Sequence, residues 1–168
     1  MEEIRELSGR KVPESHSHRN LIMHGSLGIR GEAFLGYPSV TDLALPVLIQ
    51  GKQEGKDWNL VKLQTLLTLM SRVEDGNVLS RAGRDGLKEV QKLAREFLEE
   101  GGAYQEYAIH RLVLIDELFI RKNYSNGGCA DLLAAAVFME SVEREWVTSA
   151  SCEQEELGKV ARLGESAA

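Results

Sequence analysis

Apolar residues recur through the middle of the chain at spacings of three and four, which is the period of an amphipathic α-helix. The clearest stripe follows Asp57, a favourable helix-capping residue, and places Leu60, Leu63, Leu67 and Met70 on one face. A stripe this long and uniformly apolar predicts the central buried helix of the fold.

The same period predicts four further helices. They span about 39–50, 84–100, 104–122 and 129–146. Ser39 with Asp42 three residues later resembles a capping box that begins the first of them, and Gly51 is expected to end it. Pro46 must kink or interrupt that helix, because proline lacks the backbone N–H group.

Strand signals are weak, since alternating runs of β-branched residues are nearly absent. We therefore expect an all-α bundle of about five main helices, with glycine-rich loops that bind a ligand. In domain terms, 1–23 is expected to be a polar N-terminal segment, 24–146 a single helical domain and 147–168 a frayed tail.

The charge balance excludes some functions. The chain has 168 residues, and 20 Lys and Arg against 26 Asp and Glu give a net charge of −6. Broad binding to nucleic acid or to an anionic membrane needs a basic surface, so neither partner is expected. A polyanionic ligand would instead need a local basic cluster or a metal ion. Two cysteines and no apolar run near the roughly 20 residues of a membrane span favour a reducing, cytoplasmic setting.

Three junctions between the predicted helices combine glycine with charge. They are Gly28-Ile29-Arg30-Gly31-Glu32, the stretch from Asp75-Gly76-Asn77 to Arg81-Ala82-Gly83-Arg84, and the stretch from Arg121 to Asp131. Glycine lets the backbone approach a ligand closely. Gly127-Gly128 opens the last predicted helix, where free N–H groups favour an anion, so this pair is a candidate phosphate cradle.

Four acidic residues accompany these junctions or the helices between them. Asp116 shares a face with apolar residues, and a buried acid must be paired, hydrogen-bonded or metal-bound. Each acid also has a structural interpretation: an internal salt bridge for Asp116, the helix dipole for Asp131, a helix end for Asp75 and an ion pair with Arg30 for Glu32. Together, acids beside glycine and arginine are what Mg²⁺–phosphate chemistry requires.

Cys129 admits two interpretations. A helix N-terminus lowers the pKa of a thiol, which would favour a nucleophile. No histidine is placed by the sequence as its base, so the alternative is a small packed residue.

Several motifs in order resemble the triphosphoribosyl-dephospho-CoA synthase family, which makes the prosthetic group of citrate lyase and malonate decarboxylase. The matching runs are His24-Gly25, 28–33, 36–40, Ala44-Leu45-Pro46, 69–79, Asp116 with 119–123, and 127–134. They cover about 24–140. The sequence departs from the family pattern at Gly76, Ala82 and Asn126, where the family has Thr, Gly and Pro.

The resemblance implies an all-α transferase that joins ATP to 3′-dephospho-CoA and releases adenine. We expect catalytic roles for Glu32, Asp75 and Asp131, with Glu32 as the base. Phosphate or substrate contacts are expected from Arg30, Gly31, Asn77, Arg81, Arg121, Gly127 and Gly128. Asp75, Asp131 and Asp116 are the expected ligands of Mg²⁺.

No counterpart of the family's N-terminal motifs precedes His24. We therefore expect self-association or a separate chain that carries the N-terminal half. Two other functions remain open: a nucleotide- or CoA-binding module without catalysis, and a Mg²⁺-dependent nucleotide hydrolase.

Overall fold

The stripe that begins at Leu60 forms the central helix of the fold, as the sequence predicts. The computed structural model describes residues 16–144. In it, helix α5 runs over Trp58–Arg72, and the Asp57 side chain caps it by accepting hydrogen bonds from the backbone N–H groups of Asn59 and Leu60. Val61 and Leu69 of this helix are fully buried, so α5 is the element around which the others pack.

The other elements are also helical, and no strand occurs between residues 16 and 144. They are α2 (His16–His24), α3 (Gly28–Phe34), the π-helix η2 (Ser39–Ala44), α4 (Leu45–Gln53), α6 (Gly76–Glu99), the 3₁₀-helix η3 (Gly102–Tyr104), α7 (Ala108–Arg121) and a last helix over 127–144. The all-α class is confirmed.

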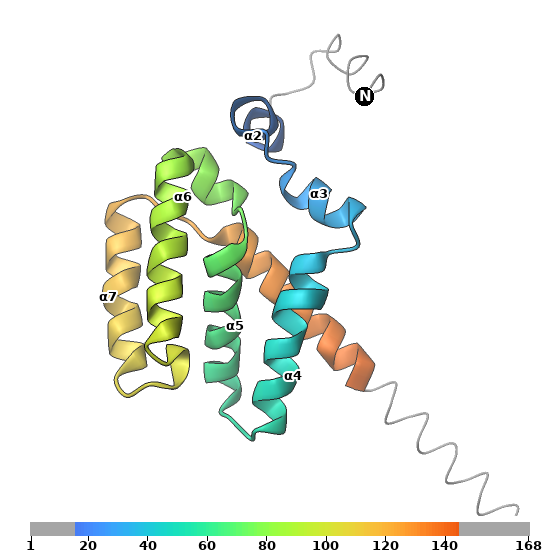
Figure 1. Cartoon of the computed structure of the whole chain (residues 1–168), viewed down its shortest axis with the longest axis vertical. Helices are drawn as coiled ribbons and strands as arrows, with labels where there is room; N and C mark the ends of the chain where they lie inside the picture. Colours follow the sequence, from blue (N-terminus) through green and yellow to red (C-terminus); the bar gives the residue numbers. More distant parts are fainter. Residues whose placement is uncertain (1–15, 145–168) are drawn as a thin grey trace, which may run out of the picture.

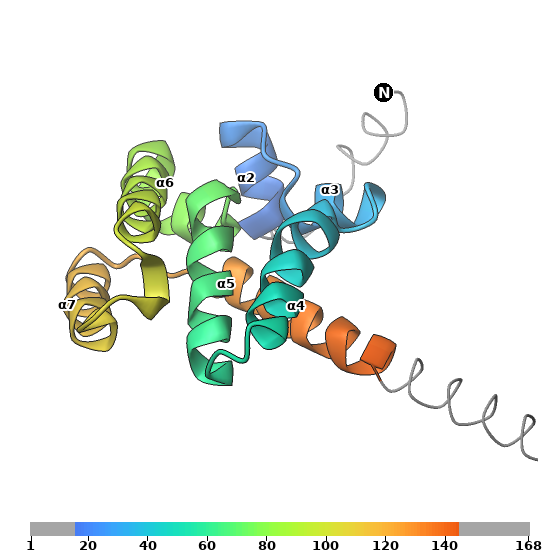
Figure 2. The same cartoon turned by 60° about the horizontal axis from the view of Figure 1, so that its bottom comes forward.

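Helices α4 to α7 stand side by side, with α7 at one edge of the layer (Figure 1). The last helix crosses behind α5 and α4, and α2 and α3 sit near one end of the layer (Figures 1 and 2). A main core joins α4, α5, α6 and the last helix, while a smaller cluster of Leu67, Phe97, Ala103 and Ala108 holds the start of α7. None of the described helices combines the length and the apolar character needed to cross a membrane.

The helix expected over 39–50 differs in how it begins and ends. Ser39 does not cap it; Ser39 starts a π-helix, and Pro46 lies in the first turn of α4, just past the point where the π-helix ends. Gly51 does not stop it, because α4 continues to Gln53. Gly51 instead lets α4 approach α5: a Cβ atom there would lie 2.6 Å from Cγ2 of Val61.

Two helical segments lie where the sequence predicted none. Residues 16–24 and 28–34 form α2 and α3, although the first falls almost wholly in the expected polar N-terminal segment and the second in an expected glycine junction. Similarly, the helix predicted over 84–100 is preceded by a helical turn from Gly76, and the two join at Gly83, whose φ of 67° is easy only for glycine. The expected frayed tail over 147–168 lies outside the described residues.

Candidate functional site

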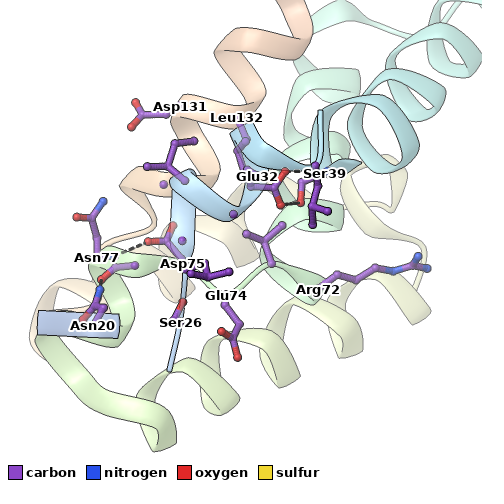
Figure 3. Close-up of a pocket in the computed structure, with 18 residues that line it drawn as sticks. Asn20, Ser26, Glu32, Ser39, Arg72, Glu74, Asp75, Asn77, Asp131 and Leu132 are labelled. Carbon is purple, nitrogen blue, oxygen red and sulfur yellow. Dashed lines mark hydrogen bonds between the residues drawn. The ribbon is translucent and has the colours of Figure 1, made fainter. Parts of the chain in front are cut away.

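A cavity of about 480 Å³ opens where α3, the α5–α6 junction and the start of the last helix meet (Figure 3). Each of the three glycine junctions contributes to its wall. The lining residues are Asn20, Ser26, Leu27, Gly28, Ile29, Gly31, Glu32, Leu35, Ser39, Arg72, Val73, Glu74, Asp75, Gly76, Asn77, Gly128, Asp131 and Leu132. Segments far apart in sequence therefore form one site, whose volume suits a small-molecule ligand.

Asp75 is the buried centre of this site. Only 2% of the residue is exposed. Its Oδ1 caps α6 by accepting hydrogen bonds from the backbone N–H groups of Asn77 (2.8 Å) and Val78 (3.4 Å), and its Oδ2 accepts one from the backbone N–H of Cys129 (2.8 Å). One carboxylate thus holds the N-terminal ends of α6 and of the last helix together.

The glycines at the start of the last helix make this approach possible. A Cβ atom on Gly128 would lie 3.1 Å from both oxygens of Asp75, and a Cβ on Gly127 would lie 2.5 Å from Nδ2 of Asn77. Because the N-terminal turns of two helices converge here, their dipoles, and the N–H groups that Asp75 does not already pair, place partial positive charge at this end of the cavity. Such an arrangement favours an anionic group of a ligand.

Glu32 lies across the cavity from Asp75 (Figure 3). Its Oε1 accepts a hydrogen bond from the Ser39 hydroxyl (2.6 Å), and its Oε2 accepts one from the Ser39 backbone N–H (3.1 Å). Glu32 therefore contacts Ser39 rather than forming the ion pair with Arg30 that the sequence allowed. The half-buried carboxylate is held in one orientation at the cavity wall.

The remaining charges give the cavity an acidic character. Asp131 is an exposed residue in the second turn of the last helix, and Glu74 is an exposed acid just before Asp75. Among the described residues, Arg72 is the one basic residue in the lining, and its side chain extends away from Asp75 and Glu32 (Figure 3). A polyanionic ligand here would need cations beyond those the wall supplies.

Five expected site residues lie outside the lining. Arg30, Arg81, Arg121 and Asp116 are exposed, and Gly127 adjoins the wall through Asn77. Arg81 donates a hydrogen bond to Asn123 (3.4 Å), and Arg121 lies 3.9 Å from Glu117 on its own helix. The roles of these residues in substrate binding stay predictions.

The expectation that Asp116 is buried is wrong. Its face of α7 points outward, and the neighbouring Val113 and Ile120 are 52% and 70% exposed. Within 16–144, no group of three or more His, Cys, Asp or Glu side chains is arranged to hold a metal ion. Asp75, Asp131 and Asp116 therefore do not form one preassembled metal centre.

The nucleophile interpretation of Cys129 is also wrong. The residue is 1% exposed, and burial raises the pKa of its thiol, an effect that the nearby Asp75 carboxylate reinforces. The expected lowering by the helix N-terminus is outweighed because the thiolate would be desolvated beside a negative charge. Cys129 is a packed core residue.

Sequence reasoning missed five polar lining residues as site residues: Asn20, Ser26, Ser39, Arg72 and Glu74. Asn20 lies on the unpredicted α2, so no periodic signal marked it. Arg84 also supports the site from outside the cavity: its guanidinium pairs with Glu74 (3.3 Å) and donates to the backbone carbonyl of His24. This contact holds the end of α2 against α6.

The comparisons with known proteins agree with the motifs in the cavity wall. A family model for ATP:dephospho-CoA triphosphoribosyl transferase matches residues 3–149. The chain belongs to this family. The match includes every residue that lines the cavity.

Curated members of the transferase family share 36–42% of aligned residues with the chain. A probable 2-(5''-triphosphoribosyl)-3'-dephosphocoenzyme-A synthase 1 of Salmonella typhi is 42% identical over 80% of this chain and 45% of its own length. The probable synthase of Malonomonas rubra is 38% identical over 76% of the chain and 40% of its own length. The synthase of Klebsiella pneumoniae is 36% identical over 84% of the chain and 46% of its own length.

The chain therefore spans less than half the length of these curated relatives. No solved structure matches it.

Proposed function

We propose that this chain supplies the nucleotide site for transfer of the triphosphoribosyl group of ATP to the 2′-hydroxyl of 3′-dephospho-CoA, with release of adenine. One observation carries the proposal. Glu32, Asp75, Asn77, Gly128 and Asp131 come from three separate segments of a family member, and all of them line one cavity.

The reaction needs a base at one side of the substrate. The 2′-hydroxyl oxygen forms a bond to C1′ of the ATP ribose, and the bond from C1′ to the adenine nitrogen breaks. The electron pair of that bond leaves with adenine, which then takes up a proton. Glu32 is the proposed base for the hydroxyl proton, because its two hydrogen bonds to Ser39 fix the carboxylate at the wall and leave each oxygen a free lone pair.

Carboxylates on the opposite side of the cavity would stabilise the positive charge that develops on the ribose. Cleavage of an N-glycosidic bond gives the ribose oxocarbenium character, which nearby negative charge stabilises. Asp75 is buried and held by three backbone N–H groups, so it cannot turn away from the cavity when the charge develops. We assign this electrostatic role to Asp75, with Asp131 nearer the opening.

The triphosphate requires further positive charge. We propose that it enters as its Mg²⁺ complex, since Mg²⁺ commonly binds through one or two carboxylates together with substrate phosphates. The donor set fits: Asp131 is exposed at the rim and Oδ2 of Asp75 retains a lone pair. The ion would neutralise phosphate charge, and the helix ends at Gly76 and Gly128 would add N–H donors.

The outer face of α7 supports an interaction with more of the family fold. Ile109, Val113 and Ile120 expose 52%, 52% and 70% of their surface in one stripe. A bundle helix normally buries such a stripe, and the curated relatives carry more than twice the aligned length. We propose that the part of the family fold outside this match covers α7.

Adenine release tests the function directly. The chain would be incubated with ATP, Mg²⁺ and 3′-dephospho-CoA, alone and with the unmatched portion of the Salmonella typhi relative, and adenine would be quantified by liquid chromatography. Acceptor-dependent adenine release supports the proposal. No adenine in either mixture contradicts it, and cleavage of ATP phosphates without the acceptor would instead identify a nucleotide hydrolase.

Substitutions assign the roles. Glu32→Gln and Asp131→Asn are expected to reduce turnover by at least about 100-fold, the usual scale for loss of a general base or a charge-stabilising group. Glu99→Gln and Asp85→Asn are matched controls, because both residues are exposed on α6 outside the cavity. Full turnover by Asp131→Asn would overturn the role of Asp131.

Metal binding has its own readout. We expect Mg²⁺ to tighten ATP binding in calorimetry without any acceptor present, and Asp131→Asn to weaken this dependence. Equal ATP affinity with Mg²⁺ and with a chelator would contradict the proposed Mg²⁺ site.

A further inference from the structure

Asn20 carries a buried hydrogen-bond acceptor that nothing in the described structure satisfies. The residue lies on α2, is 5% exposed and lines the cavity beside Gly76 and Asn77 (Figure 3). Its Nδ2 donates a hydrogen bond to the backbone carbonyl of Gly76 at 2.8 Å. Its Oδ1 is buried and has no partner.

The Gly76 contact fixes which atom is free. If the amide were turned over, Oδ1 would face the Gly76 carbonyl oxygen, and two acceptors would repel each other. The free group is therefore the oxygen rather than the NH₂ group. Buried polar atoms are nearly always paired in folded proteins, so an orphaned acceptor in a cavity wall indicates a donor that arrives with a ligand.

Helix α2 makes two attachments to α6, through Asn20 and through its C-terminal residue His24. The same helix is held at its other end, where Arg84 donates to the backbone carbonyl of His24. The Nδ2 contact with Gly76 therefore holds the Asn20 amide at α6, and the Arg84 contact holds the end of the same helix.

We propose that Oδ1 of Asn20 reads the nucleoside part of the substrate by accepting a hydrogen bond from an N–H or O–H group. This inference rests on the proposed nucleotide site. Ionised phosphate oxygens are acceptors only, so they cannot satisfy Oδ1 and are repelled by it. The donors on a bound nucleotide are the adenine amine and the ribose hydroxyls. Asn20 is therefore a specificity residue that directs the nucleoside toward α2 and the phosphates toward other parts of the wall.

The apolar part of the wall is compatible with this orientation. Leu27 and Ile29 line the same cavity from the α2–α3 connection and from α3, next to the buried Ser26. Cavity walls that bind small molecules commonly combine apolar area with a few fixed polar groups, and the apolar area suits a base or ribose better than a phosphate.

A cycle that changes both the protein and the ligand tests the proposal. Calorimetry would measure binding of ATP, purine riboside triphosphate (which lacks the 6-amine), 2′-deoxy-ATP and 3′-deoxy-ATP to the unmodified chain and to Asn20→Ala. We expect Asn20→Ala to weaken ATP binding about 5- to 100-fold, the range for an unmade buried hydrogen bond. We also expect one analogue to bind weakly to the unmodified chain but to lose nothing further in Asn20→Ala.

The analogue that shows this coupling identifies the donor as the amine or as one hydroxyl. Ile22→Ala is the matched control, because it shortens an exposed side chain on the same helix outside the cavity and leaves the contacts of Asn20 and Arg84 intact. Ile22→Ala is expected to keep the discrimination between ATP and that analogue. If Asn20→Ala does not fold, equal binding of ATP and all three analogues by the unmodified chain would still overturn the proposal.

Two results overturn the inference. One is equal affinity of the unmodified chain for ATP and all three analogues. The other is a fully additive effect of Asn20→Ala and every analogue. Both leave the transferase proposal standing, whereas failure of the unmodified chain to bind any nucleotide contradicts the two proposals together.

Discussion

Oδ2 of Asp75 accepts a hydrogen bond from the backbone N–H of Cys129 at 2.8 Å, across 54 residues of sequence. The same carboxylate caps α6 through Asn77 and Val78. The relative position of two helix ends at the cavity is therefore set by one side chain, and the stability of the site is tied to its chemistry.

Replacing Asp75 tests this connection. Asp75→Ala removes a helix cap and leaves the Cys129 N–H buried without a partner, so we expect a loss of about 2–4 kcal/mol in the free energy of unfolding. Asp57→Ala is the matched control, because Asp57 caps α5 with a comparable pair of bonds but makes no contact of this kind, and should cost about 1 kcal/mol. Urea denaturation measures both, and equal losses would show that the Cys129 contact adds nothing.

The thiol of Cys129 is expected to be unreactive in the folded protein. Burial and the Asp75 carboxylate raise its pKa, so the nucleophilic thiolate is scarce and also shielded. In a Cys152→Ser background, iodoacetamide at pH 8 should leave Cys129 unmodified until urea is added, as read by intact mass. Rapid modification of the folded protein would restore the nucleophile interpretation.

The effect of Gly51→Ala on the free energy of unfolding should change sign when Val61 is also replaced. Gly51→Ala places a Cβ atom 2.6 Å from Cγ2 of Val61, and this overpacking should cost about 1–3 kcal/mol, more than the roughly 1 kcal/mol gained in helix propensity. In a Val61→Ala background the clash with Val61 disappears and the 3.2 Å approach to the Tyr104 hydroxyl is the close contact that remains, so the same substitution should stabilise the fold. Thermal unfolding of the four proteins measures the effect, and a loss in both backgrounds would place the strain elsewhere.

Glu89 on α6 contacts both Lys122 and Tyr124, and these contacts make the free energy of unfolding depend on pH. Its carboxylate accepts hydrogen bonds from Lys122 and from the Tyr124 hydroxyl (2.6 Å), which lower the pKa of Glu89 and raise that of Tyr124 to about 12. The contribution of Glu89 is present above its ordinary pKa of 4.5 and is lost as the pH falls through the lower folded value. That of Tyr124 is present below its ordinary pKa of 10 and is lost as the pH rises toward 12.

Glu89→Gln should therefore lower the melting temperature most between about pH 5 and 10, with the difference shrinking on both sides. Lys92→Gln is the control, since its ion pair with Glu96 lies within one exposed helix face and is worth little. A difference that stays constant from pH 3 to pH 11 would contradict the assignment.

The apolar stripe on α7 gives a test of association. Val113→Glu combined with Ile120→Glu should leave the melting temperature of the chain nearly unchanged, because both side chains are exposed, but should abolish binding of the unmatched portion of the Salmonella typhi relative. His110→Glu adds one glutamate at an exposed position of α7 outside the stripe and should preserve binding, and each single variant, Val113→Glu or Ile120→Glu, is compared with it. Pairing of this chain only with itself in analytical ultracentrifugation would instead favour self-association.

Periodicity predicted the long helices well because they bury a continuous stripe. Helix α5 illustrates this, since Asp57, Leu67 and Met70 behave as expected. The short elements escaped prediction for a physical reason. Helices α2 and α3 are held in part by single contacts, such as Asn20 to the Gly76 carbonyl, and such contacts between distant residues leave no trace in local sequence.

The site shows the same division. The glycine junctions identified Glu32, Asp75, Asn77 and Gly128 because unusual residue types cluster there, and all four line the cavity. Asp116 failed because neighbouring apolar residues were taken to mean burial, whereas this face of α7 is exposed. A helical period reveals which residues share a face but not whether another element covers that face.

The cavity wall extends along the chain from Asn20 to Leu132, and its polar contacts join residues 54 and 56 positions apart. Contacts of such high sequence separation form late, because the loops between them must close first. Partly folded chains with native helices would therefore still lack the site. Only the molecules that have completed folding would bind the ligand. A nucleotide would therefore shift the folding equilibrium toward the folded state.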